Sequence, residues 1–447
     1  MKPYLYLFGL LFFFFNVPQT TAIKNTLGFL LLLSSLFVIH RQKNLIIDNF
    51  SFVESSNVFL SLIFLSIYIL LNSLFFAWEP IWSLGEFKSH WLYPVIYFFS
   101  GATLVFSLSR RPNYGNRLLS FIFIFLTIHI VIGVTKFLLD SFSSGVILFR
   151  VGGFIGAELT SYIANIIQAF ILGELLYRFI KGKKYMIFSS RLIILIFFLV
   201  TLTTFFTAVR NSIVIFALLL LLSVILILFL NKFSSTKKKN SPLILLSIIL
   251  IVSMSASSIF YDKRWISLVE TINIAIDIKN NKAWLDKDKY PLPKLANGEE
   301  VSRSNYERIA WAYQGLKYIY NHPAVGIGFG RNIFGHAIEH EYTYLLGETA
   351  KKTRGMHSHS GIIDFTIGVG IIGAFGWFIF IFLLLKFFFL NIKKNISAPS
   401  MIGLLLSISF VARSFVDSFM RDHMFQQFML LMGILLALSV IERKENI

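Results

Sequence analysis

Residues 357–373 read HSHSGIIDFTIGVGIIG, and they lie where a polar stretch of the chain meets a long apolar one. The preceding stretch, 261–358, carries many charged side chains, whereas the following stretch, 361–390, is almost wholly apolar. His359 stands at this boundary, and an imidazole titrates near neutral pH. If the apolar stretch spans a membrane, the sequence predicts chemistry at the membrane–water boundary.

The composition indicates a membrane protein. The chain is 56% hydrophobic and only 14% charged, with a mean hydropathy of +0.72. A soluble protein of this size lacks the charged surface to cover so much apolar area. A bilayer core of ~30 Å requires about 20 residues of helix. We therefore expect an all-α polytopic membrane protein with about twelve transmembrane helices, at 3–20, 24–39, 57–76, 92–109, 118–139, 159–180, 189–208, 211–230, 241–260, 361–390, 399–418 and 424–441.

The first apolar run, the long run at 361–390 and the absence of cysteine further define this class of membrane protein. The first apolar run follows Lys2, so a cleaved signal peptide is an alternative to a retained first helix, which the many later spans favour. The run 361–390 is long enough to tilt, kink or begin with a non-spanning turn. The chain has no cysteine, which excludes disulfides, thiol catalysis and thiolate metal sites.

The net charge of +18 is concentrated in alternate short connections, near residues 41–43, 110–117, 178–191, 232–239, 393–394 and 443–444. All of these fall on one side of a membrane if the N-terminus is cytoplasmic, which satisfies the positive-inside rule. The charge therefore indicates topology rather than nucleic-acid binding, and both termini are expected in the cytoplasm. We expect helices one to nine in 1–260, a large periplasmic loop in 261–358, and helices ten to twelve in 359–447.

The large loop is nearly balanced in charge, so we expect a small, partly helical cap. A helix is expected at 302–321, where His322-Pro323 ends it. The glycine-rich stretch 326–330 is expected to form a flexible turn.

The face opposite the basic connections carries the candidate site. Arg210 lies between two apolar runs, where a charge costs roughly 2.5–3.5 kcal/mol at full membrane depth. It is either an arginine that reaches the interface or a guanidinium that binds phosphate oxygens. Arg308 on the loop helix is either solvated or a second anion ligand. Arg150 precedes glycines at the entrance of a helix, whose free amides offer a weak anion site.

Other polar residues leave two interpretations open. Arg413, Asp417 and Arg421 share one helix face at intervals of four, so they form either a structural ladder or part of a site. A zinc site is the alternative for His357 and His359, but the spacing of the neighbouring residues lacks a third ligand; these neighbours are His336, Glu339, His340 and Glu341. We expect no metal. Arginines with one histidine suit transfer from a diphosphate leaving group.

The pattern His359-Ser360, nine residues, then Gly370-x-x-Gly373 resembles that of the bacterial O-antigen ligases, within the ligase and polymerase superfamily of lipopolysaccharide assembly. Arg210 resembles the arginine between two membrane helices of those enzymes, and Arg308 that of their long periplasmic loop. Asp417 with Arg421 resembles their polar pair near the penultimate helix. Ala374 follows the second glycine where some members have threonine, and the first 150 residues carry no matching motif.

The resemblance implies an inner-membrane glycosyltransferase without metal or cofactor. Its donor is an undecaprenyl-diphosphate-linked O-antigen, its acceptor a sugar hydroxyl of lipid A–core, and transfer inverts the anomeric centre on the periplasmic side. His359 is then the general base, and Arg210 and Arg308 bind the diphosphate. Possible supporting residues are Arg150, His357, Gly370, Gly373, Asp417 and Arg421.

Three alternatives remain open. An O-antigen polymerase uses the same donor but often carries two sizeable outer loops, whereas this chain has one large loop and a modest one at 140–158. A protein O-oligosaccharyltransferase is less favoured. A transporter is expected to show internal repeats and ionisable residues at mid-membrane; here Lys136 and Glu174 are the exceptions to a one-sided distribution of charge.

Overall fold

The computed structural model describes residues 2–109, 111, 113–146, 150–231, 268–286, 288–420 and 423–445. The expected span at 241–260 and the candidate residue Arg421 lie outside these ranges. Within them the only β pairing is an isolated bridge between Lys294 and Glu300. The protein is therefore almost entirely helical, as expected.

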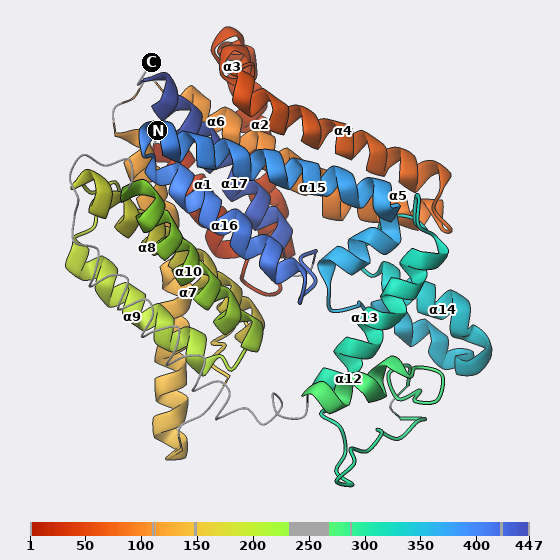
Figure 1. Cartoon of the computed structure of the whole chain (residues 1–447). Coiled ribbons are helices and arrows are strands. Elements are labelled where there is room, and N and C mark those ends of the chain that lie inside the picture. The colour runs from red at the N-terminus through yellow and green to blue at the C-terminus, as the bar shows by residue number, and fades with distance from the viewer. Residues whose placement is uncertain are drawn as a thin grey trace.

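A bundle of helices forms the larger part of the molecule (Figure 1). Its long elements are α1 (Lys2–Phe14), α2 (Thr21–Arg41), α4 (Val53–Phe75), α6 (Tyr93–Ser107), α7 (Tyr114–Ser144), α8 (Ala157–Lys181), α9 (Ser190–Phe206), α10 (Arg210–Asn231), α15 (Gly361–Asn395), α16 (Ala398–Ser414) and α17 (Met424–Lys444). Short elements connect them: α3 (Lys43–Phe50), α5 (Pro80–Phe87) and the π-helix η1 (Lys88–Leu92). Each expected span except 241–260 overlaps one of these helices, although α1 and α16 end before the expected residues 20 and 418.

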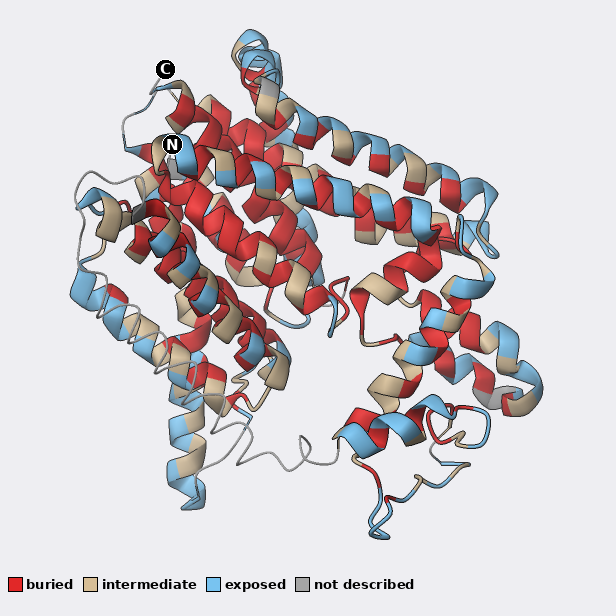
Figure 2. Cartoon of the chain, in the orientation of Figure 1, coloured by how far each residue is buried: buried red, intermediate tan, exposed pale blue. Residues whose placement is uncertain are grey.

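Seven described helices are long and apolar enough to cross a membrane by length and composition: α2, α4, α7, α8, α10, α15 and α17. Large apolar side chains remain exposed on outer helices, such as Phe64, Leu139 and Phe198. Contiguous exposed apolar surface of this kind marks a membrane-facing protein. By contrast, α17 is buried along almost its whole length at the centre (Figure 2). The chain is an all-α membrane protein.

Helix α17 packs closely on α6 because both helices carry glycine at the contact. A Cβ at Gly433 would collide with the Phe98 carbonyl, and one at Gly101 would lie 2.9 Å from the Leu430 side chain. Small residues let membrane helices approach closely, which compensates for the weak hydrophobic drive between helices in lipid.

The two ends of the bundle differ in composition. The chain ends lie together at one end (Figure 1). There Glu54 pairs with Arg443 and, at 3.2 Å, with Lys394, and Lys444 pairs with Asp48 at 2.8 Å. These basic connections thus share one end, in agreement with the charge pattern of the sequence.

The cap lies against the opposite end. It contains α12 (Leu268–Ile276), α13 (Arg303–Asn321), α14 (Ile333–Leu346) and the 3-10 helix η3 (Gly347–Gly355). Its own hydrophobic core gathers side chains that include Trp284, Tyr306, Phe334 and Ile338. The cap helix expected at 302–321 is α13.

Helix α15 is broken at Gly370, where φ is 68° and ψ is −177°. The cap stretch that begins at Pro323 pairs with the broken turn: the Gly328 amide donates to the Gly368 carbonyl at 2.9 Å, and the Ile371 amide donates to the Pro323 carbonyl at 2.8 Å. Of the tilt, kink or non-spanning turn considered for this run, the structure shows a kink. The prediction of a flexible turn at 326–330 is wrong, because its backbone is paired with the helix break.

Helix α4 also contacts the broken turn of α15 and the cap stretch, and we call this meeting point the crossing. The Tyr68 hydroxyl donates to the Val369 carbonyl at 2.8 Å, and the Asn72 amide donates to the Val325 carbonyl at 2.5 Å. A Cβ at Gly373 would lie 2.8 Å from the Tyr68 ring. The glycines of the motif therefore have a structural role: they let α4, α15 and the cap meet.

Candidate active site

His359 lies in the tight turn that precedes α15. Its φ is 56°, in the left-handed region that few non-glycine residues adopt. Its amide donates to Nδ1 of His357 at 3.2 Å, and the two rings lie 4.1 Å apart. Ser360 then caps α15 by accepting from the Ile363 amide at 3.3 Å. His357 thus shapes the turn that presents His359.

The cap contacts His359 through an aromatic ring. Trp311 of α13 stacks on the imidazole, with centroids 5.2 Å apart and planes inclined by 5°. The Trp311 indole N–H donates to the Trp284 carbonyl at 2.8 Å, which fixes the ring. Arg308 lies three residues before Trp311, so it occupies the neighbouring part of the same helix surface. His357 is only 7% exposed and His359 is half-buried, so His359 is the more accessible imidazole.

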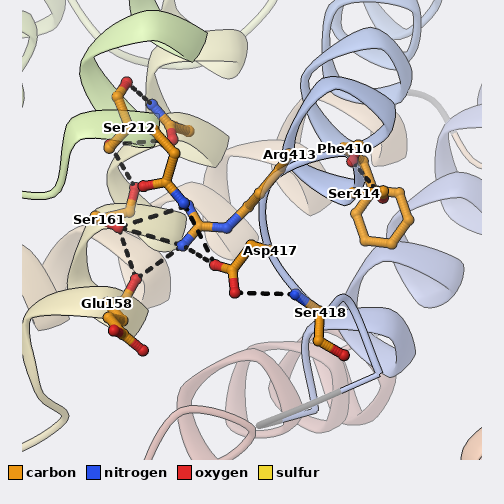
Figure 3. A network of polar contacts seen from close by, with 10 residues as sticks. Glu158, Ser161, Ser212, Phe410, Arg413, Ser414, Asp417 and Ser418 are labelled. Carbon is orange, nitrogen blue, oxygen red and sulfur yellow. Dashed lines mark hydrogen bonds and ion pairs between the residues drawn. The ribbon is translucent and has the colours of Figure 1, made fainter. Parts of the chain in front are cut away.

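Asp417 contacts three parts of the chain around this turn, and Figure 3 shows its contact with Arg413. Its carbonyl accepts from the Gly361 amide at 2.9 Å. Its carboxylate accepts from the Arg413 guanidinium at 3.1 Å and from the Asn211 amide at 3.5 Å. Asn211 follows Arg210 at the start of α10. Asp417 thus connects the turn after His359 with the helix end that carries Arg210.

Arg413 is buried and mainly structural. It is 3% exposed, and its guanidinium donates to the Glu158 carbonyl at 3.3 Å and to the Ser161 hydroxyl at 3.4 Å (Figure 3). Helix α16 ends at Ser414. The expected helix face through Arg413, Asp417 and residue 421 is therefore wrong, because Asp417 lies in the turn beyond the helix.

A second buried acid supports the histidine turn. Asp364, in the first turn of α15, is fully buried, and its carboxylate accepts from the Ser358 amide at 2.9 Å. A carboxylate near a helix N-terminus is favoured by the helix dipole. Sequence reasoning did not single out Asp364, although an acid at the start of an apolar run is a detectable signal.

Arg150 borders a different site, which we call the basic cavity. This cavity of about 730 Å³ is lined by the basic side chains Lys24, His90, Arg150, Arg331 and His423, by Glu158, and by Gly156 and Ala157 where α8 begins. Burial lowers the pKa of His90 to about 4, against the opposing effect of Glu86. The lasting positive charge therefore comes from Lys24, Arg150 and Arg331.

The basic cavity adjoins the histidine turn. Met420, which also lines the cavity, follows Phe419, and a Cβ at Gly361 would collide with the Phe419 ring. Sequence reasoning identified Arg150 and the start of α8 but missed Lys24 and Arg331. Those two come from distant segments, and no local pattern marks their convergence.

The histidines considered for zinc pack on tryptophans instead. His336 stacks on Trp82 at 3.7 Å between ring centroids, and His340 lies on Trp78 at 4.6 Å. Across the described part of the chain, no three His, Asp or Glu side chains converge in a metal-binding arrangement.

The fold and site together define a helical membrane protein with a polar cap that covers a histidine-bearing turn. Residues 195–378 match the family model described as O-antigen ligase. This match agrees with the resemblance and supports, in general terms, an enzyme of the ligase or polymerase type. Comparison with curated protein sequences found no match. The matched region includes Arg210, Arg308 and His359 but ends before Asp417.

Proposed function

We propose that the protein is an O-antigen ligase that transfers polysaccharide from undecaprenyl diphosphate to a sugar hydroxyl of lipid A–core. The observation that carries the proposal is the position of His359. It is held between the cap and the bundle, against Trp311, and Asp417 links its turn to the arginine-bearing start of α10. This arrangement suits a base that acts at the membrane surface.

The proposed reaction is an inverting displacement. His359 accepts the proton of the acceptor hydroxyl, whose oxygen attacks the anomeric carbon of the donor sugar from the face opposite the diphosphate. The new glycosidic bond forms as the bond to the diphosphate oxygen breaks, and undecaprenyl diphosphate departs with the electron pair. Arg210 and Arg308 stabilise the charge that develops on the leaving group.

The supporting residues have distinct proposed roles. His357 and Asp417 orient the turn of His359, and Gly370 and Gly373 permit the crossing that seats the cap. Arg150, in the adjoining basic cavity, attracts the anionic headgroup. No metal or cofactor takes part in the proposed step, because arginines supply the positive charge.

The proposed location is the bacterial inner membrane, with both termini cytoplasmic and the site periplasmic. The described structure supports this orientation, since basic side chains and chain ends share one end of the bundle and the cap lies at the other. We further propose twelve spans, with nine in 1–260, the cap in 261–358, and three in 359–447.

A deletion strain tests the proposal and separates it from polymerase activity. A ligase deletion removes all polymer from lipid A–core on a lipopolysaccharide gel, while lipid-linked polymer accumulates. A core that carries a single repeat would show that the protein is a polymerase instead. An unchanged gel would contradict both assignments.

A further inference from the structure

One face of α13 leads away from His359 toward the outer end of the cap. Arg303, Glu307 and Trp311 follow at intervals of four residues, so their side chains lie along one side of the helix. Trp311 contacts His359, and Arg303 lies ~12 Å further along the axis, given a rise of about 1.5 Å per residue. This face therefore begins at the proposed base and continues away from it.

A cavity of about 320 Å³ follows this face, and we call it the cap cavity. Its polar and aromatic lining comprises Trp284, Asp286, Asp288, Arg303, Glu307, Trp311, Lys352 and Thr353. Its volume is at the lower end of the ~300–1,000 Å³ that small-ligand sites occupy. It is thus large enough for a small part of a longer ligand.

The charges of the cap cavity are of both signs and are partly accessible. Arg303 and Glu307 form an ion pair at 2.7 Å, with side chains 49% and 16% exposed. Asp288 and Lys352 are exposed on the cavity wall. Asp286, by contrast, accepts from the Asp288 amide at 3.0 Å and so shapes the loop.

This chemistry differs from that of the basic cavity. Its charged side chains include both carboxylates and cations, and Ala283, Leu285, Leu346 and Met356 complete the lining, so the wall does not favour an anion or a cation. It suits a neutral ligand rich in hydroxyl groups, because hydroxyls donate to carboxylates and accept from guanidinium and ammonium groups. The Trp311 indole adds a flat apolar surface, on which the C–H face of a sugar ring can pack.

We propose that the cap cavity is a saccharide subsite, which holds sugar residues next to the one that reacts at His359. The proposal rests on the ligase function proposed above and adds where the sugar chain is bound. The saccharide belongs either to the donor polymer or to the acceptor core, since both present hydroxyl-rich rings of the same chemistry. The basic cavity is then the proposed binding site for phosphate groups.

Binding to the purified full-length protein in detergent tests this proposal. The probes are lipid-free O-polysaccharide and lipid-free core oligosaccharide, each titrated by calorimetry. We expect one of them to bind the wild type, and Asp288→Ala and Glu307→Gln to weaken that binding at least tenfold. Glu299→Ala is the matched control, because Glu299 is an exposed acid of the cap that does not line the cavity. The probe that loses affinity identifies the source of the saccharide.

A second variant separates this inference from the proposed function. His359→Ala is expected to abolish transfer and to keep saccharide binding within about threefold of wild type. If neither saccharide binds the wild type, or if Asp288→Ala and Glu307→Gln bind as the control does, the subsite is overturned while the ligase assignment stands. If His359→Ala still transfers polymer, the proposed mechanism fails whatever the binding result.

Discussion

The imidazole of His359 and the indole of Trp311 lie parallel, 5.2 Å apart between centroids, and this stack joins the cap to the start of α15. The two residues come from different parts of the molecule, a cap helix and a turn at the bundle end. Displacement of the cap would therefore remove the surface against which the proposed base is held.

Replacement of Trp311 tests this positioning role. An aromatic pair contributes ~0.5–1.5 kcal/mol, so Trp311→Ala is expected to lower kcat about two- to tenfold. Trp311→Phe should recover most of that loss, because a flat ring remains. The measurement is the steady-state rate of polymer transfer, with kcat and KM determined separately. Equal kcat in Trp311→Ala and wild type would show that the stack does not position His359.

Arg210 tests the anion-binding proposal. Arg210→Lys keeps the charge but loses the planar, bidentate guanidinium, so we expect a large fall in transfer. The same change at Arg308 should have a similar effect. Transfer rates of the two variants, normalised to membrane-inserted protein, provide the measurement. Near-normal turnover would mean that these arginines are structural.

Gly370 is expected to be essential for folding rather than for chemistry alone. Its φ of 68° disfavours any side chain, and a Cβ would collide with the Ala324 carbonyl. Strained backbone of this kind costs about 1–3 kcal/mol, so Gly370→Ala should clearly lower the thermal stability of the protein in detergent. Gly85→Ala in α5 is the control, since nothing lies within 4 Å of its added Cβ. A Gly370→Ala protein as stable as the control would contradict the fold of the crossing.

Arg413 and Lys136 form ion pairs of the same type in different environments. Arg413 pairs with Asp417 at side-chain exposures of 4% and 17%, whereas Lys136 pairs with Asp140 at 54% and 46%. Removal of one partner from a buried pair costs about 3–5 kcal/mol, and an exposed pair contributes about 0–1 kcal/mol. Arg413→Gln should therefore lower the midpoint of thermal unfolding much more than Lys136→Gln. Similar shifts for both would show that Arg413 is not a structural anchor.

The lowered pKa of His90 predicts that the stability of the protein depends on pH. Burial lowers the pKa of His90 to about 4, and Arg331 and His423 also oppose its protonation, whereas Glu86 favours it. The native state then binds fewer protons than the unfolded state between about pH 4 and 6.5, so stability falls as the pH falls through that window. His90→Gln should flatten this part of the profile. Thermal unfolding between pH 4 and 8 measures it, and parallel profiles for variant and wild type would refute the assignment.

Hydropathy was sufficient to predict the long described helices of the bundle, because a bilayer requires runs of apolar residues whatever their partners. It misplaced the end of α16, since the apolar residues after Arg413 continue the pattern while the chain already turns at Ser414. The backbone pairing of the segment at 326–330 could not be predicted for a related reason. Its partners, Ile367 and Gly368 beside the helix break, lie 40 residues away, and a glycine-rich sequence gives no sign of such pairing.

The candidate site was predictable only in part. The motif singled out His359 and Gly370, and the position of Arg210 between two apolar runs and of Arg308 on the loop helix singled out the arginines; their roles stay predictions. Trp311 was not predicted, since helical periodicity does not reveal which face of α13 meets the histidine turn. The cationic wall of the basic cavity was missed because Lys24 and Arg331 come together only in three dimensions.

The most direct test of the account is transfer in proteoliposomes that contain undecaprenyl-diphosphate-linked O-antigen and lipid A–core, with His359→Ala compared with wild type. General-base catalysis contributes about 10²–10⁴-fold, so we predict that His359→Ala lowers the rate by at least 100-fold while the protein remains folded and inserted. Transfer by His359→Ala at the wild-type rate would contradict the proposed role of His359.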